Sequence, residues 1–63
     1  MTKSELIKQR EIERALAAWA MREYGYQLRE IGVILGRIVD GRPLSPPRVF
    51  RMVESGQRIM DSD

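Results

Sequence analysis

The 63-residue sequence contains no cysteine and no histidine. Without cysteine there are no disulfides and no thiolate metal site, and without histidine the commonest metal ligand and general base is missing. No glycine-rich phosphate-binding loop or metal-ligand spacing occurs, and no carboxylate is paired with an evident partner acid or base. A chain of this length also has too few core side chains to wall off a deep substrate pocket. We therefore expect no catalytic residue, no metal and no cofactor, and the sequence argues against an enzyme.

Long apolar runs are also missing, since none approaches the roughly 18 residues that cross a bilayer. The opening segment MTKSELIKQRE lacks the apolar core of a secretory signal. We therefore expect a cytoplasmic protein with no membrane partner. The chain is 43% hydrophobic and 32% charged, which is typical of a folded domain rather than a disordered tail. Residues 1–63 are expected to form one domain.

Aromatic residues make up only 6% of the chain, too few for the stacking surfaces that bind single-stranded nucleic acid. The net charge of +2 says little by itself, but its distribution is uneven. Residues 1–36 are nearly balanced, whereas residues 37–58 carry five arginines against Asp40 and Glu54. Arginine suits contacts to phosphate and guanine, so this half of the chain is the candidate for a nucleic-acid partner.

The first helix is predicted over residues 4–24, with Ser4 as N-cap and Gly25 just beyond its end. Its predicted core face has the three- and four-residue spacing of one helix side and comprises Ile12, Leu16, Trp19, Ala20 and Glu23, with Ala15 beside them. Leu6, Ile7 and Met21 fall off this face.

The second helix is predicted over residues 27–39, and its buried face comprises Leu28, Ile31, Leu35, Ile38 and Val39. Gly32 lies among them and would let a neighbouring helix approach closely. The segment DGRPLSPP then breaks the chain, with Ser45 as a suitable N-cap and Pro46 as a suitable first residue of a third helix over 46–60. A loose C-terminal tail follows. The predicted fold class is all-α, a three-helix domain with a helix-turn-helix.

The third helix has two different sides at about 100° per residue. The predicted core side comprises Val49, Met52, Val53, Gly56, Ile59 and Met60. About 120° away lies a polar stripe of Arg48, Arg51, Ser55 and Arg58. By itself such a stripe has two interpretations, a solvated helix face or a surface that binds DNA. Phe50 lies outside the core sector, so it is either at the edge of the core or exposed.

Two segments, YQLREIGVILG (26–36) and LSPPRVFRMVE (44–54), resemble the helix-turn-helix in region 4 of bacterial sigma factors. That family has Thr-Leu-x-Glu-Ile-Gly-x-x-Leu-Gly, a short turn and then Ser-x-x-x-Val-x-x-Ile. The matching positions are Leu28, Glu30, Ile31, Gly32, Leu35, Gly36, Ser45, Val49 and, with a changed side chain, Met52. The resemblance is close over 27–54 and loose over 12–60. In place of the family's tight turn, about seven extra residues (37–43) are present. Either the second helix is prolonged through Val39, or a small loop protrudes.

The resemblance implies that the helix at 46–60 enters the major groove while the helix at 27–39 crosses the backbone. Arg48 and Arg51 would then reach base edges or phosphates, and Ser55 and Arg58 would contact the backbone. Further candidate DNA-binding residues are Gln27, Arg29, Arg37, Arg42 and Ser45. Alternatively, Ser45 only starts the helix, and Arg37 and Arg42 only belong to a connector.

The sequence thus favours a small transcription regulator that binds double-stranded DNA in a sequence-specific manner. The alternative is a protein-interaction module that binds RNA polymerase or another regulator without reading DNA. One module covers a small DNA footprint, so we expect a homodimer. Leu6, Ile7 and Met21 are the predicted dimer contacts along the first helix.

Overall fold

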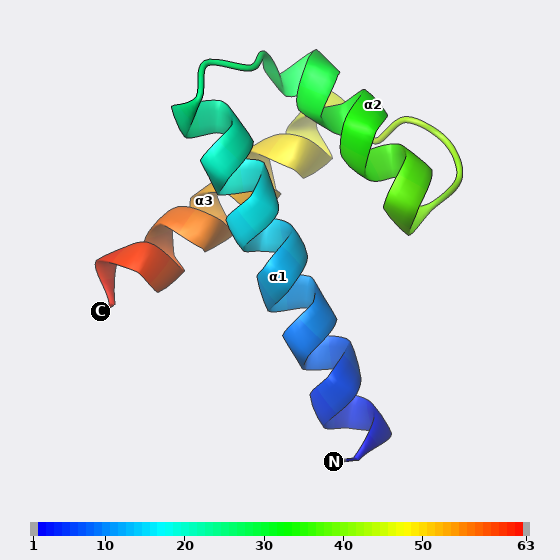
Figure 1. The fold of residues 1–63 in the computed structure, drawn as a ribbon, viewed down its shortest axis with the longest axis vertical. Helices are drawn as coiled ribbons and strands as arrows, with labels where there is room; N and C mark the ends of the chain where they lie inside the picture. The colour runs from blue at the N-terminus through cyan, green and yellow to red at the C-terminus, as the bar shows by residue number, and fades with distance from the viewer. Residues whose placement is uncertain (1, 63) are drawn as a thin grey trace.

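The computed structural model describes residues 2–62 as three helices, α1 (Lys3–Glu23), α2 (Leu28–Val39) and α3 (Pro46–Asp61) (Figure 1). Contacts between α1 and α3 predominate, and α2 lies across one end of this pair. The molecule measures 34 × 29 × 16 Å, so it is thin and encloses few side chains completely. The prediction of an all-α three-helix fold is confirmed. Within residues 2–62 no helix has the length and apolarity that would cross a membrane.

Local hydrogen bonds fix both ends of α1. Its N-cap is Thr2 rather than the predicted Ser4, because the Thr2 hydroxyl accepts the Glu5 N–H at 3.2 Å and the Glu5 carboxylate accepts the Thr2 N–H at 3.4 Å. At the other end Gly25 adopts φ 102° and donates its N–H to the Arg22 carbonyl at 3.0 Å. This left-handed glycine confirms the predicted helix stop.

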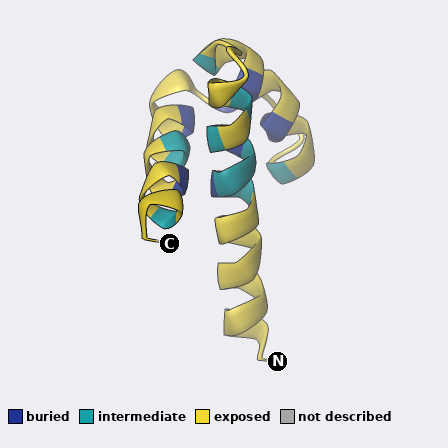
Figure 2. Cartoon of the chain, turned by 60° about the vertical axis from the view of Figure 1, so that its left-hand side comes forward, coloured by how far each residue is buried: buried dark blue, intermediate teal, exposed yellow. Residues whose placement is uncertain are grey.

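The core lies where the three helices meet (Figure 2). Its buried apolar residues are Ala15, Ala18, Ile31, Leu35, Leu44 and Val49. The predicted face of α1 is therefore partly right: Ala15 at its edge is buried, and Leu16 and Trp19 are half-buried. Ile12 is 45% exposed, Ala20 and Glu23 are exposed, and Ala18 outside the predicted face is buried, so the buried side is rotated from the predicted one.

The close approach of α1 to α3 at Gly56 explains this rotation. A Cβ added at Gly56 would lie against the Ala15 carbonyl oxygen and 2.6 Å from the Trp19 Cβ. Only a residue without a side chain fits this contact, and alanines on the facing helix allow the two backbones to come together. Trp19 is half-buried beside it and donates its indole N–H to the Gln57 side-chain oxygen at 2.7 Å.

The connector between α2 and α3, residues 40–45, folds back against α2. The Leu44 N–H donates to the Gly32 carbonyl at 3.0 Å, and the Leu44 side chain is buried in the core. A Cβ at Gly32 would meet the Leu44 carbonyl oxygen at 2.5 Å, and one at Gly36 would lie 2.7 Å from the Pro43 Cα. The closest neighbour of Gly32 is therefore the connector backbone, while the predicted neighbouring helix is also near, through the Val49 side chain of α3 at 3.3 Å. The extra residues 37–43 are divided between a longer α2 and this connector.

Several predicted core residues lie at the surface instead. Ile38 is 70% exposed, because it lies in the last turn of α2, and Met60 near the end of α3 is 42% exposed. Phe50 is 52% exposed, so of its two predicted positions, the edge of the core or the surface, it takes the surface. Met21 is half-buried and packs against the core.

The end of α3 is better ordered than the loose tail predicted after residue 60. The helix extends to Asp61, and Ser62 caps it by donating its hydroxyl to the Arg58 carbonyl at 2.8 Å. Asp63, the last residue of the predicted tail, lies outside the described residues.

Candidate nucleic-acid interface

Four polar side chains form what we call the arginine face of α3: Arg48, Arg51, Ser55 and Arg58. All four are exposed, while Val49 and Gly56 on the opposite side of the same helix are buried. At about 100° per residue, Arg51 and Arg58 lie nearly half a turn away from Val49, and Arg48 and Ser55 both lie to one side of them. Because the apolar side of α3 is buried, the arginine face points to solvent, as the amphipathic pattern of this helix predicted.

The arginine face is only partly neutralised within the chain. Arg48 forms an ion pair with Asp40 at 3.6 Å, and the two side chains are 52% and 50% exposed. An exposed pair of this kind contributes at most about 1 kcal/mol, so it leaves Arg48 available to a stronger partner. Among residues 2–62, neither Arg51 nor Arg58 has a carboxylate within ion-pair distance.

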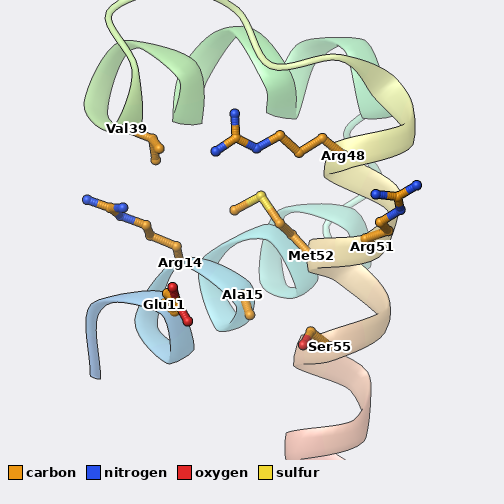
Figure 3. A pocket seen from close by; sticks show the side chains of 8 residues that line it. All are labelled: Glu11, Arg14, Ala15, Val39, Arg48, Arg51, Met52 and Ser55. Atoms are coloured by element: carbon orange, nitrogen blue, oxygen red, sulfur yellow. The ribbon is translucent and has the colours of Figure 1, made fainter. Parts of the chain in front are cut away.

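Beside the arginine face lies an open hollow of about 340 Å³ between α1 and α3, which we call the α1–α3 hollow. Its apolar floor comprises Ala15, Val39 and Met52, and its polar lining comprises Glu11, Arg14, Arg48, Arg51 and Ser55. Figure 3 shows Arg14 and Arg48 extending from the two helices toward Val39. The hollow therefore brings a cation of α1 next to the arginine face.

The other predicted site residues are dispersed over the surface. Gln27 is the N-cap of α2, where its N–H donates to the Glu30 carboxylate at 3.0 Å, and Arg29 is exposed in the next turn. Arg37 is exposed near the end of α2, far along the helix from Gln27. The structure thus separates these residues into two groups at opposite ends of α2.

The connector does not form an arm that reaches away from the domain. Arg42 is exposed, but its carbonyl lies against Gly36 and holds the backbone close to α2. Ser45 is the N-cap of α3 as predicted, yet its side chain makes no capping hydrogen bond. With Pro46 and Pro47 next to it, two backbone donors are missing at this helix start, so it is a poor site for an anion.

Sequence reasoning did not assign Glu11, Arg14 or Asp40 to the site. Glu11 and Arg14 had the pattern of solvated charges on α1, and Asp40 that of a turn residue. Their positions beside Arg48 depend on how α1 and α2 cross α3, which no local pattern encodes. The small Ala15 opposite Gly56 is the signal that could have set the rotation of α1.

No group of three or more potential metal ligands occurs among the described residues. Comparison with protein-family models, curated proteins and solved structures found no match to this chain. The resemblance to sigma-factor region 4 therefore stays a prediction, based on Gly32, Gly36 and the residues around them.

Proposed function

We propose that the protein binds double-stranded DNA in a sequence-specific manner and acts as a small transcription regulator, with α3 in the major groove. The observation that carries this proposal is the arginine face, which is exposed on a helix whose opposite side is buried. An α-helix with its side chains is about 10–12 Å wide, and the major groove is about 12 Å wide. Arginine forms paired hydrogen bonds to guanine and to phosphate, so it suits both kinds of contact there.

The proposed DNA contacts of the arginine face differ along the helix. Arg48 and Arg51, in the first two turns of α3, are proposed to contact base edges or phosphates. Ser55 and Arg58 follow toward the C-terminus and are proposed to contact the sugar-phosphate backbone. Gln27 and Arg29, at the start of α2, are proposed to contact a flanking phosphate.

Replacing Arg48 and Arg51 together with alanine is expected to weaken duplex binding by roughly 10- to 100-fold. The duplex is first selected from a random pool with the unaltered protein, and its dissociation constant is then measured by filter binding at several salt concentrations. Because both side chains are exposed, the melting temperature should stay within a few degrees of the parent value, roughly the scale of a surface change.

The matched control for this variant is Lys3→Ala with Arg10→Ala, which removes two exposed cations of α1 away from the arginine face. It should leave most of the affinity intact. Equal binding by the Arg48/Arg51 variant and the parent protein would show that α3 is the wrong surface. Failure of the parent protein to enrich any duplex from the pool would refute the DNA-binding function itself.

A homodimer is proposed because one small module makes few DNA contacts, and α1 offers a surface for pairing. Residues 3–13 of α1 are all exposed, and the N-terminal part of this helix projects beyond the rest of the molecule (Figures 1 and 2). Leu6 and Ile7, which are 41% and 49% exposed, lie in this part. A short helical segment that packs against nothing is only marginally stable in water. Pairing with the same segment of a second copy of the protein would stabilise it. Met21 packs within its own chain and is withdrawn from the predicted contact.

The variant Leu6→Glu with Ile7→Glu is expected to convert the dimer to monomer in sedimentation experiments. Acidic residues near a helix N-terminus are favourable, so the change should not weaken α1 itself. Ile34→Glu serves as the control, since Ile34 is similarly exposed at 43% but lies on α2. A parent protein that sediments as a monomer at high concentration would argue against the dimer.

A second candidate function is binding to RNA polymerase or another regulator without DNA. The observation that favours it is the apolar exposure of α2, where Ile38 is 70% and Ile34 43% exposed. Salt distinguishes the two functions, because each phosphate contact contributes about 0.9 to the log–log slope of affinity against salt. A protein partner held through isoleucines would show little such dependence.

A further inference from the structure

The side chains around the α1–α3 hollow carry a net positive charge. Its lining brings three guanidinium groups, those of Arg14, Arg48 and Arg51, and one carboxylate, that of Glu11. Asp40, which pairs with Arg48, adds a second carboxylate. The three guanidinium groups and two carboxylates have a net charge of +1, which would balance the negative charge of one phosphodiester group.

The arrangement of these groups suits an anion placed between α1 and α3. Arg14 comes from α1 and Arg48 from α3; both extend toward Val39, and Met52 lies between them (Figure 3). Among residues 2–62 Arg14 has no carboxylate within ion-pair distance. Two guanidinium groups that face one hollow attract the same anion, and their contributions add.

We propose that Arg14 of α1, together with Arg48, binds a backbone phosphate of the DNA duplex in the α1–α3 hollow. The inference rests on the proposed function and adds α1 to the DNA-binding surface, which the sequence had limited to α2, α3 and their connector. The phosphate oxygens accept hydrogen bonds from the two guanidinium groups, with the Ser55 hydroxyl as a further donor at the edge of the hollow. The contact fixes the orientation of α3 in the groove and reads no sequence.

The test compares Arg14→Gln with Arg10→Gln in duplex binding over a range of salt concentrations. Arg10 is also an exposed arginine of α1, one turn before Arg14; both line a second hollow beside Leu35 and Ile38, but only Arg14 lines the α1–α3 hollow. Arg14→Gln is expected to weaken binding about fivefold and to reduce the log–log salt slope by about 0.9, equally for selected and unrelated duplexes. Because Arg10 does not line the α1–α3 hollow, Arg10→Gln is expected to change both quantities much less.

Two further variants separate a phosphate contact from a structural effect of Arg14, which is half-buried. Arg14→Lys keeps the positive charge, so its log–log salt slope should equal that of the parent protein. If Arg14 had only a structural role, the salt slope would not follow the charge at this position. Glu11→Gln removes a carboxylate from the same hollow and should tighten binding about twofold.

The outcomes distinguish the inference from the function on which it rests. If Arg14→Gln and Arg10→Gln behave alike while the Arg48/Arg51 variant loses binding, the inference is overturned and the DNA-binding proposal stands. If none of these variants changes duplex binding, both are overturned.

Discussion

Replacing Gly56 with alanine is expected to lower the free energy of unfolding by about 2 kcal/mol, or roughly 10 °C in melting temperature. Alanine is the better helix former by about 1 kcal/mol, so a helix considered alone would gain. In this fold the new methyl group would lie against the Ala15 carbonyl oxygen and 2.6 Å from the Trp19 Cβ, neither of which is a flexible side-chain end. The helices α1 and α3 must therefore move apart along their main contact.

Thermal unfolding followed by circular dichroism measures this effect, with Glu54→Ala as control. Glu54 is exposed on the same helix, so its replacement changes helix propensity without touching α1. A Gly56→Ala protein that melts at or above the temperature of the control would contradict the close approach of α1 and α3.

Gly36→Ala is expected to be more destabilising, by about 3 kcal/mol, since all three nearest neighbours of the new methyl group are backbone atoms of the connector. The added Cβ would lie against the Arg42 carbonyl oxygen, 2.7 Å from the Pro43 Cα and 2.9 Å from the Arg42 carbonyl carbon. The connector would lift away from α2 and draw Leu44 from the core. In a domain whose total stability is small, a loss of this size leaves much of the protein unfolded.

Urea unfolding provides the measurement, and Arg37→Ala is the control because Arg37 is the next helical residue and is exposed. The Gly36→Ala midpoint should fall well below that of the control. Equal midpoints would mean that the connector does not depend on contact with Gly36.

The sequence predicts the elements of this fold better than their packing. Helix ends have local causes, such as the left-handed Gly25 and the Ser45–Pro46 start of α3, so they are readable from neighbouring residues. The rotation of α1 is not local. Ile12 and Leu16 carry the stronger hydrophobic signal, yet the smaller Ala15, at the contact with Gly56, and Ala18 are the buried residues.

The connector illustrates the same limit. Leu44 is surrounded by proline, glycine and polar residues, which is the pattern of an exposed loop, but it is buried. Its burial depends on a groove made by Gly32 and Gly36 one helical turn apart on α2. These glycines also carry part of the resemblance to sigma factors, although here they receive a connector that the family's tight turn does not have.

The candidate site divides in the same way. The arginine face was predictable because it is defined within one helix, by its angle to the apolar residues of α3. The positions of Arg14 and Asp40 were not predictable, since both residues lie outside α3. Arg14 lines the same hollow as Arg48, and Asp40 pairs with Arg48, only because of how the three helices are arranged.

The hydrogen bond from the Trp19 indole to Gln57 has a practical consequence for studying the protein. Trp19 is the only tryptophan of the chain, and it lies at the contact between α1 and α3. Its intrinsic fluorescence therefore reports on the separation of these two helices without an attached dye. Emission shifting to longer wavelength would signal water reaching the indole, and its time course would give the rate at which the helix pair opens.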